Sequence, residues 1–210
     1  CINIGFAAFE AVPAIYGGTL TIPDSVINIG DQAFADYLTN APITIGNNVE
    51  TIGDNAFFRA GSYSPDGLII PDSVTTIGYR AFYQYGVQST GGPLVIGDGV
   101  TFIGQEAFRA SDFTSLVLGN SVEVIRQGAF VQNYNITGPI VFPATITDIE
   151  IGSFWHSNFT SIHFLGTTAP NIASLNFSVS TATEIRVPSN ATGYAASYDG
   201  IPVVYDLPAG

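Results

Sequence analysis

A nine-residue pattern, Val-x-x-Ile-Gly-x-x-Ala-Phe, recurs along this 210-residue chain and constrains its fold more than any other feature. Residues 26–34 are the first full copy, and later copies vary at single positions. The closing Phe returns every 22 to 26 residues, at Phe9, Phe34, Phe57, Phe82, Phe108, Phe130 and Phe154. A period of roughly 20–29 residues is typical of a solenoid, in which each coil buries its apolar side chains only against neighbouring coils. The repeat predicts a single elongated domain with the phenyl rings stacked along its interior.

Each repeat also contains a short segment whose first and third residues are apolar, which predicts a strand with one buried face. In the copy that begins at Leu20-Thr21-Ile22, Pro23 ends the strand and Asp24 favours a turn. Gly30 is expected to allow a bend, and a single helical turn is expected to carry Phe34 into the core. The equivalent strands should stack in parallel about 4.8 Å apart. They are expected at residues 20–22, 43–45, 68–70, 94–96, 116–118, 140–142, 162–164 and 185–187.

The repeat resembles the BspA-type leucine-rich repeat, whose units read Leu-x-Ile-Pro-x-Ser-Val-x-x-Ile-Gly-x-x-Ala-Phe. Residues 68–82 match this pattern almost position for position, and residues 185–196 resemble the family's closing segment. Arg126 and Glu150 depart from it at the Gly position, and residues 166–181 fit no repeat. The resemblance implies a β-dominated leucine-rich-repeat solenoid of the α/β type. Its curved parallel sheet of about eight short strands would have short helical turns or loops on the opposite side.

The repeat boundaries predict one domain over residues 1–210. A truncated first repeat is expected at about residues 1–9, core repeats at 20–165 and an irregular C-terminal cap at 166–210.

The charge balance excludes some partners. Seventeen acidic residues against five basic ones give a net charge of −12, which repels nucleic acid and anionic lipid headgroups. Gly, Pro, Asn and Asp interrupt every apolar run before the ~18 residues that a membrane-spanning helix needs. We therefore expect neither nucleic-acid binding nor direct membrane insertion.

No cluster of residues predicts catalysis. The two histidines, His156 and His163, lie on different expected elements, and no Gly-rich phosphate loop or Gly-x-Ser-x-Gly turn is present. An Asp or Asn follows most strands, as at Asp24, Asp72 and Asp98, where turn chemistry explains it better than a calcium site. We expect no enzyme activity, no metal and no cofactor.

Two groups of side chains are candidates for binding. The central residues of successive strands point away from the core and form an apolar ladder, Ile69, Val95, Val117 and Val141, followed by His163. A contiguous apolar surface often marks a contact site, although β-propensity alone also favours such residues. Aromatic residues follow the Phe of several repeats, namely Tyr83, Tyr85, Tyr134 and Trp155. Variable loops on a rigid scaffold are where recognition concentrates, but the same rings could instead cover the core.

The leading hypothesis is a non-catalytic extracellular or cell-surface module that binds protein or cell-surface ligands. It depends on the resemblance, since that family implies surface or secreted proteins of bacteria and protists that act in adhesion. The alternative is a structural subunit of a surface layer, appendage or virion that self-associates through its faces.

Overall fold

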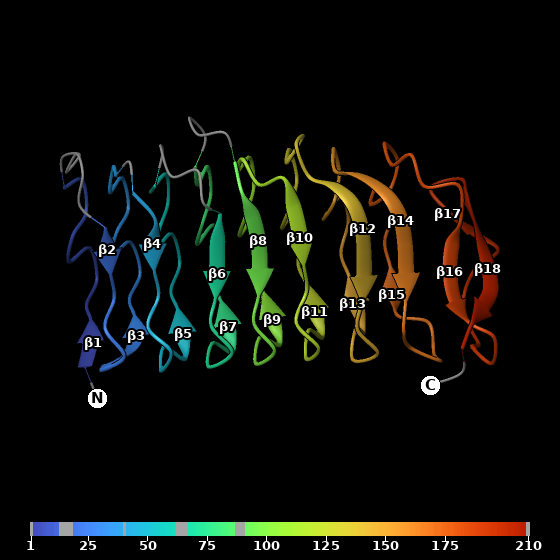
Figure 1. Ribbon diagram of the computed structural model, residues 1–210, viewed down its shortest axis with the longest axis horizontal. Helices are drawn as coiled ribbons and strands as arrows, with labels where there is room; N and C mark the ends of the chain where they lie inside the picture. Colours follow the sequence, from blue (N-terminus) through green and yellow to red (C-terminus); the bar gives the residue numbers. More distant parts are fainter. Residues whose placement is uncertain (1, 13–18, 40, 62–66, 87–90, 209–210) are drawn as a thin grey trace.

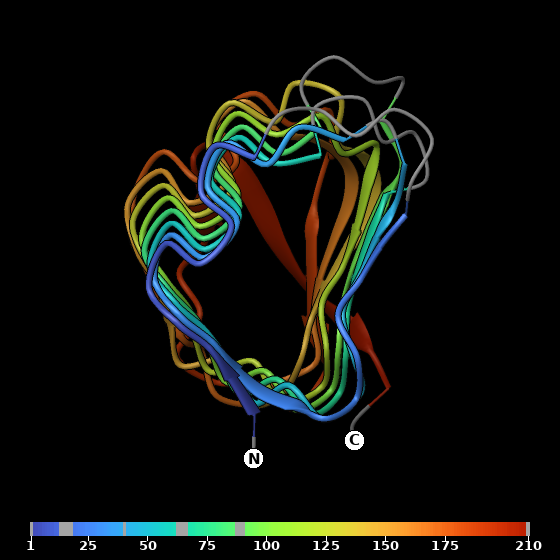
Figure 2. The same ribbon diagram turned by 90° about the vertical axis from the view of Figure 1, so that its left-hand side faces the viewer.

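The computed structural model describes residues 2–12, 19–39, 41–61, 67–86 and 91–208, which form one stack of coils (Figure 1). Viewed along the stack, successive coils superpose and the strands fall on two sides of each coil (Figure 2). A scalloped backbone of tight turns closes a third side. The solenoid predicted from the repeat is confirmed.

The strands expected from the alternating segments are all present and parallel. They are hydrogen-bonded in three groups rather than in one continuous sheet. The groups are β2 (Leu20–Thr21) with β4 (Ile43–Thr44); β6 (Leu68–Ile70), β8 (Pro93–Ile96) and β10 (Ser115–Val117); and β12 (Thr137–Phe142), β14 (Asn158–Phe164), β16 (Ile185–Pro188) and β18 (Ile201–Leu207). The short β17 (Ser197–Tyr198) pairs antiparallel with β18 at the C-terminal end. We call the side of the coil that these strands form the strand face.

A second parallel sheet of eight strands was not expected from the sequence. It is built from the Val-x-x-Ile part of the repeat, to which the sequence interpretation assigned no strand. Its members are β1 (Ile2–Ile4), β3 (Val26–Ile29), β5 (Thr51–Ile52), β7 (Thr76–Ile77), β9 (Phe102–Ile103), β11 (Val124–Ile125), β13 (Asp148–Ile149) and β15 (Asn171–Ile172). Residues 166–181, which fit no repeat in sequence, therefore still supply a strand of this sheet.

The predicted helical turn around each Ala-Phe pair is wrong, because the described residues contain no helix. Alternate N–H groups instead bond within a tight turn and across to the next coil. Ala33 N donates to Gly30 O at 3.3 Å, while Phe34 N donates to Ala56 O at 2.7 Å. This alternation places Gln32 and Asp36 at a φ of 56°. We call this side of the coil the turn face.

The phenyl rings of the repeat form the predicted internal stack. Ring centroids of consecutive coils lie 5.0–5.3 Å apart from Phe9 to Phe154, with interplanar angles of 7° or less. Phe177 extends the stack at 6.3 Å. Every ring from Phe34 onward is fully buried, so each coil is held by its two neighbours.

The Gly that follows the Ile of the repeat is required by the close approach of coils. Its φ is not positive at Gly30, Gly53, Gly78 or Gly104. A Cβ on Gly104 would lie 2.5 Å from the carbonyl oxygen of Gly78 in the preceding coil. Gly5, in the first coil, has nothing within 4 Å of the same point. Arg126 and Glu150, which replace this Gly in consecutive coils, form an ion pair with each other.

Candidate binding surfaces

The central residues of the strand face lie in register, as the sequence predicted for the apolar ladder. Ile69, Val95 and Val117 are direct partners on β6, β8 and β10. Val141 and His163 are direct partners on β12 and β14. Ile69 is 67% exposed, Val117 and Val141 are also exposed, and Val95 and His163 are partly covered. The ladder is therefore an accessible stripe of apolar side chains across two strand groups.

Hollows and acidic side chains border this stripe. A hollow of about 370 Å³ lies where β4 and β6 are not bonded, between Pro42, Thr44 and Ile69. A second, of about 440 Å³, runs from Ile69 past Val95 and Val117 to the row of Asp72 and Asp98 that follows the strands. The stripe thus combines an apolar centre with a negatively charged border.

The Asp row links neighbouring coils, whereas the sequence interpretation gave each Asp a role within its own turn. Asp24 Oδ1 accepts a hydrogen bond of 2.7 Å from the backbone N of Asn47 in the next coil. Asp72 and Asp98 accept in the same way from the next coil, each at 2.9 Å. Because one carboxylate oxygen of each Asp has this role, the row joins coils and keeps its charge at the surface.

The aromatic candidates do not form one surface. Tyr85 is only 1% exposed, so its predicted binding role is wrong. Its ring packs against Phe82 and Phe113, each with centroids 5.8 Å away, beside the small residue Gly61. The interior has room for Tyr85 because no side chain occupies the space at Gly61.

Tyr83, Tyr134 and Trp155 lie at the surface beside the turn face. Tyr83 stacks on Phe58 of the preceding coil at 5.0 Å. The ring of His156 stacks on Tyr134 at 4.9 Å and on Trp155 at 4.3 Å. The structure therefore brings Tyr134 and Trp155 together around a histidine and leaves Tyr83 apart from them.

Sequence reasoning missed a hollow of about 270 Å³ next to Trp155. Its lining includes Glu106, Arg109, Gln132, Ile151 and Leu175 from four consecutive coils of the turn face. The signal in the sequence is a pair of glycines, Gly128 and Gly152, at a repeat position where the two preceding coils carry the long side chains of Arg80 and Glu106.

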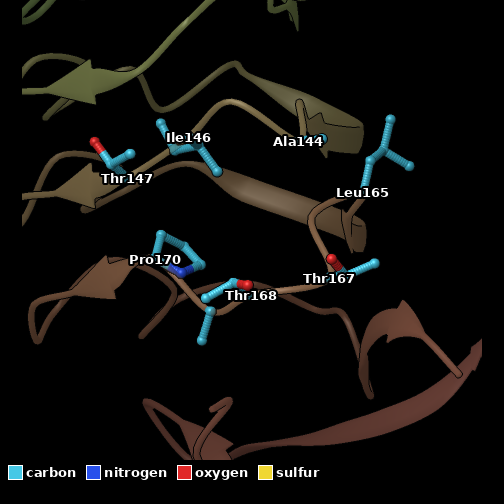
Figure 3. A pocket seen from close by; sticks show the side chains of 8 residues that line it. Ala144, Ile146, Thr147, Leu165, Thr167, Thr168 and Pro170 are labelled. Atoms are coloured by element: carbon cyan, nitrogen blue, oxygen red, sulfur yellow. The ribbon is translucent and has the colours of Figure 1, made fainter. Parts of the chain in front are cut away.

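A further hollow, of about 400 Å³, lies toward the C-terminal end between the turns that follow β12 and β14 (Figure 3). Thr147, Thr167 and Thr168 supply its hydroxyl groups, and Ile146, Leu165 and Pro170 are among its apolar residues. None of its eight lining residues is titratable, so this hollow offers no general acid or base.

Tyr194 is a buried titratable residue with a structural role. Burial raises the pKa of Tyr194 to about 12, with smaller contributions from Tyr198 and Tyr205, and its hydroxyl donates to Gly166 O at 3.0 Å. Throughout the described part of the chain, no three His, Cys, Asp or Glu side chains gather closely enough to hold a metal ion. No helix among those residues has the length and apolar character to cross a membrane.

Comparison with known proteins identifies the repeat. The chain matches the sequence profile described as "BspA type Leucine rich repeat region" in six copies, over residues 2–137 and 101–197. Its fold is similar to the crystal structure of a leucine-rich repeat protein from Bacteroides ovatus, with a TM-score of 0.59 at 21% identity. That similarity covers 91% of this chain and 48% of the other, so the chain spans about half the length of that protein. No curated protein matches the chain.

Proposed function

The chain belongs to the BspA-type leucine-rich repeat family, and we propose that it is a non-catalytic extracellular module whose strand face binds a protein ligand. The repeat family itself points to a scaffold for protein interaction. The proposal of cell-surface location and adhesion is supported by the family, which is typically associated with the cell surface.

The observation that carries the proposal is the exposed ladder Ile69, Val95, Val117 and Val141. Apolar side chains in register across neighbouring strands make a contiguous patch, and patches of this kind on a soluble surface mark interaction sites. The central strand β8 is hydrogen-bonded on both sides, to β6 and β10, so recognition at Val95 would depend on side-chain contacts.

The charge border defines the chemistry of the ligand. Asp72 and Asp98 flank the ladder, and the whole chain carries a net charge of −12. A complementary ligand surface has apolar side chains at its centre and Lys or Arg at its margin. Because the charged contacts lie at the rim, association should weaken as salt concentration rises.

The test compares a ladder variant with a control variant for binding to a panel of purified extracellular-matrix and cell-surface proteins by biolayer interferometry. Val95→Asp with Val117→Asp places charge inside the ladder and should abolish binding. Thr21→Asp adds charge at the same strand position of an earlier coil, away from the hollows that border the ladder, and should leave binding intact. Unchanged binding by the first variant, with an unchanged melting temperature, would exclude the ladder as the site.

The alternative, a structural subunit, depends on the same ladder. Ile69 and Val117 are exposed, and Val95 lies between them in register. A second copy of the chain placed against this stripe would cover these apolar side chains.

Self-association is tested by sedimentation velocity across a concentration series. Assembly through the ladder predicts oligomers that Val95→Asp with Val117→Asp removes, while Thr21→Asp retains them. A chain that stays monomeric at every concentration would rule out the subunit role.

A further inference from the structure

The hollow beside Trp155 results from two glycines on the turn face. The residue before the Ala of each repeat has a positive φ throughout, with values of 50° at Arg80, 55° at Glu106, 63° at Gly128, 64° at Gly152 and 65° at Leu175. The backbone is therefore the same in these coils, and two consecutive coils lack the side chain. A trough of about 270 Å³ remains between Glu106 at one end and Leu175 at the other.

The apolar side of the trough contains Trp155, whose indole ring is held in one orientation. Trp155 is 41% exposed and lines the trough together with Val131, Ile151 and Leu175. One ring face of Trp155 is covered by His156, which is in turn stacked on Tyr134. The opposite face of the indole is the flat surface that a ligand can contact, and its orientation is set before binding.

The polar part is a connected set of planar side chains. Arg109 Nη1 donates to Glu106 Oε1 at 3.1 Å, and Arg109 Nε donates to Gln132 Oε1 at 3.2 Å. Arg80 Nε donates to Glu106 Oε2 at 2.6 Å, and this hydrogen bond raises the pKa of Arg80. Gln127 lines the trough from the adjoining repeat position. These groups offer both donors and acceptors in fixed directions, and the charges of Glu106 and Arg109 offset each other.

We propose that this trough binds one neutral pyranose ring of a glycan. A pyranose has a flat face of C–H groups, which stacks on an aromatic ring, and a margin of hydroxyls that both donate and accept hydrogen bonds. Trp155 lines the trough together with Glu106, Arg109 and Gln132, so the trough supplies both kinds of contact. Its volume is slightly below the usual range for drug-sized ligands and suits a single ring. The chain's net charge of −12 disfavours acidic sugars.

This site goes beyond the proposed protein-binding function, since the trough lies on the turn face and the ladder on the strand face. Binding of sugar and binding of protein are therefore separable by mutation. Val95→Asp with Val117→Asp should leave the trough unaffected.

The experiment is isothermal titration of the full chain with the methyl glycosides of glucose, galactose, mannose and N-acetylglucosamine. We expect saturable binding of at least one glycoside, with a dissociation constant in the millimolar range and a change in Trp155 fluorescence. Gly128→Gln should weaken that binding at least tenfold by filling the trough. The fold should accept this variant, since Gln32 occupies the same repeat position with a φ of 56° and a Cβ on Gly128 would approach Val131 Cγ1 no closer than 3.3 Å.

Two further variants keep the test decisive. Trp155→Ala should abolish binding without touching the turn backbone, and Gln32→Gly, far from the trough at the same repeat position, should leave binding unchanged. Absence of saturable binding for all four glycosides would overturn the proposal. Wild-type affinity in both Gly128→Gln and Trp155→Ala would also overturn it. So would saturable binding of N-acetyltryptophanamide, a stand-in for a peptide side chain, without any glycoside response.

Discussion

The phenyl stack predicts that one substitution will have very different costs at two equivalent positions. Phe82 is fully buried, with Phe57 at 5.0 Å on one face and Phe108 at 5.1 Å on the other. Truncation of a buried Phe costs about 3–5 kcal/mol, and a ring with stacked partners lies at the upper end of that range. We therefore expect Phe82→Ala to lower the free energy of unfolding by about 4–5 kcal/mol.

Phe9→Ala is the matched comparison, because Phe9 occupies the same repeat position with one stacked neighbour. About half of its ring surface is buried, and roughly 100 Å² at 25 cal/mol per Å², without a closed cavity, gives an expected cost of about 2.5 kcal/mol.

The assay is urea unfolding of both variants, followed by circular dichroism and by the fluorescence of Trp155, the chain's single tryptophan. Coincident transitions by the two probes would show that coils remain cooperative, so that the extrapolated free energies are comparable. Equal costs for the two variants, or a cost below about 2 kcal/mol for Phe82→Ala, would refute the view that stacked neighbours hold each coil in place.

Two further predictions concern the positive φ of Ala110 and the buried hydroxyl of Tyr194. Ala110 has a φ of 54°, so Ala110→Gly should raise the free energy of unfolding by about 0.5–1 kcal/mol in urea titration, whereas Ala107→Gly, at a buried position without positive φ, should lower it. The folded state raises the pKa of Tyr194 from 10.0 to about 12, so it favours the protonated phenol. The resulting stabilisation is complete below pH 10 and is lost as the pH rises toward 12. Thermal melts of the wild type and Tyr194→Phe should therefore converge over that interval, and parallel curves would contradict the assigned linkage.

The strands and the phenyl stack were predictable because their signals are periodic at two levels. Alternation within a segment such as Leu20-Thr21-Ile22 predicts a strand, and its recurrence every 22 to 26 residues predicts that the strands stack. The second sheet escaped prediction because most of its strands are two residues long, as in Thr51–Ile52, and two residues carry no alternation. Hydrogen bonds from coil to coil create these strands, so their cause is the stacking and not the local sequence.

The turn face was mispredicted for a related reason. A short run such as Ala33-Phe34-Ala35 has helical propensity, but half of its N–H groups are used by the next coil. Satisfying those donors requires alternating turns with a positive φ, which Gln32 and Asp36 adopt despite the usual steric cost of about 1–2 kcal/mol per residue. Hydrogen bonds of this kind between coils outweigh a local preference, since each further coil adds the same bonds again.

Binding candidates could be placed from the sequence where every coil repeats the position, and could not be placed where one coil differs from the others. The ladder could be read from the sequence because Val95 and Val117 occupy a position that every coil repeats. Tyr85 could not be placed, since its burial depends on Gly61 in the preceding coil and on Phe113, far along the chain. In a solenoid the backbone geometry of one repeat position is nearly constant, so a residue that differs from its column changes the surface and leaves the fold intact. Gly128 and Gly152 keep the positive φ of Glu106 and Leu175 and remove only the side chain, which is how two small departures from the repeat hollow out a site beside Trp155.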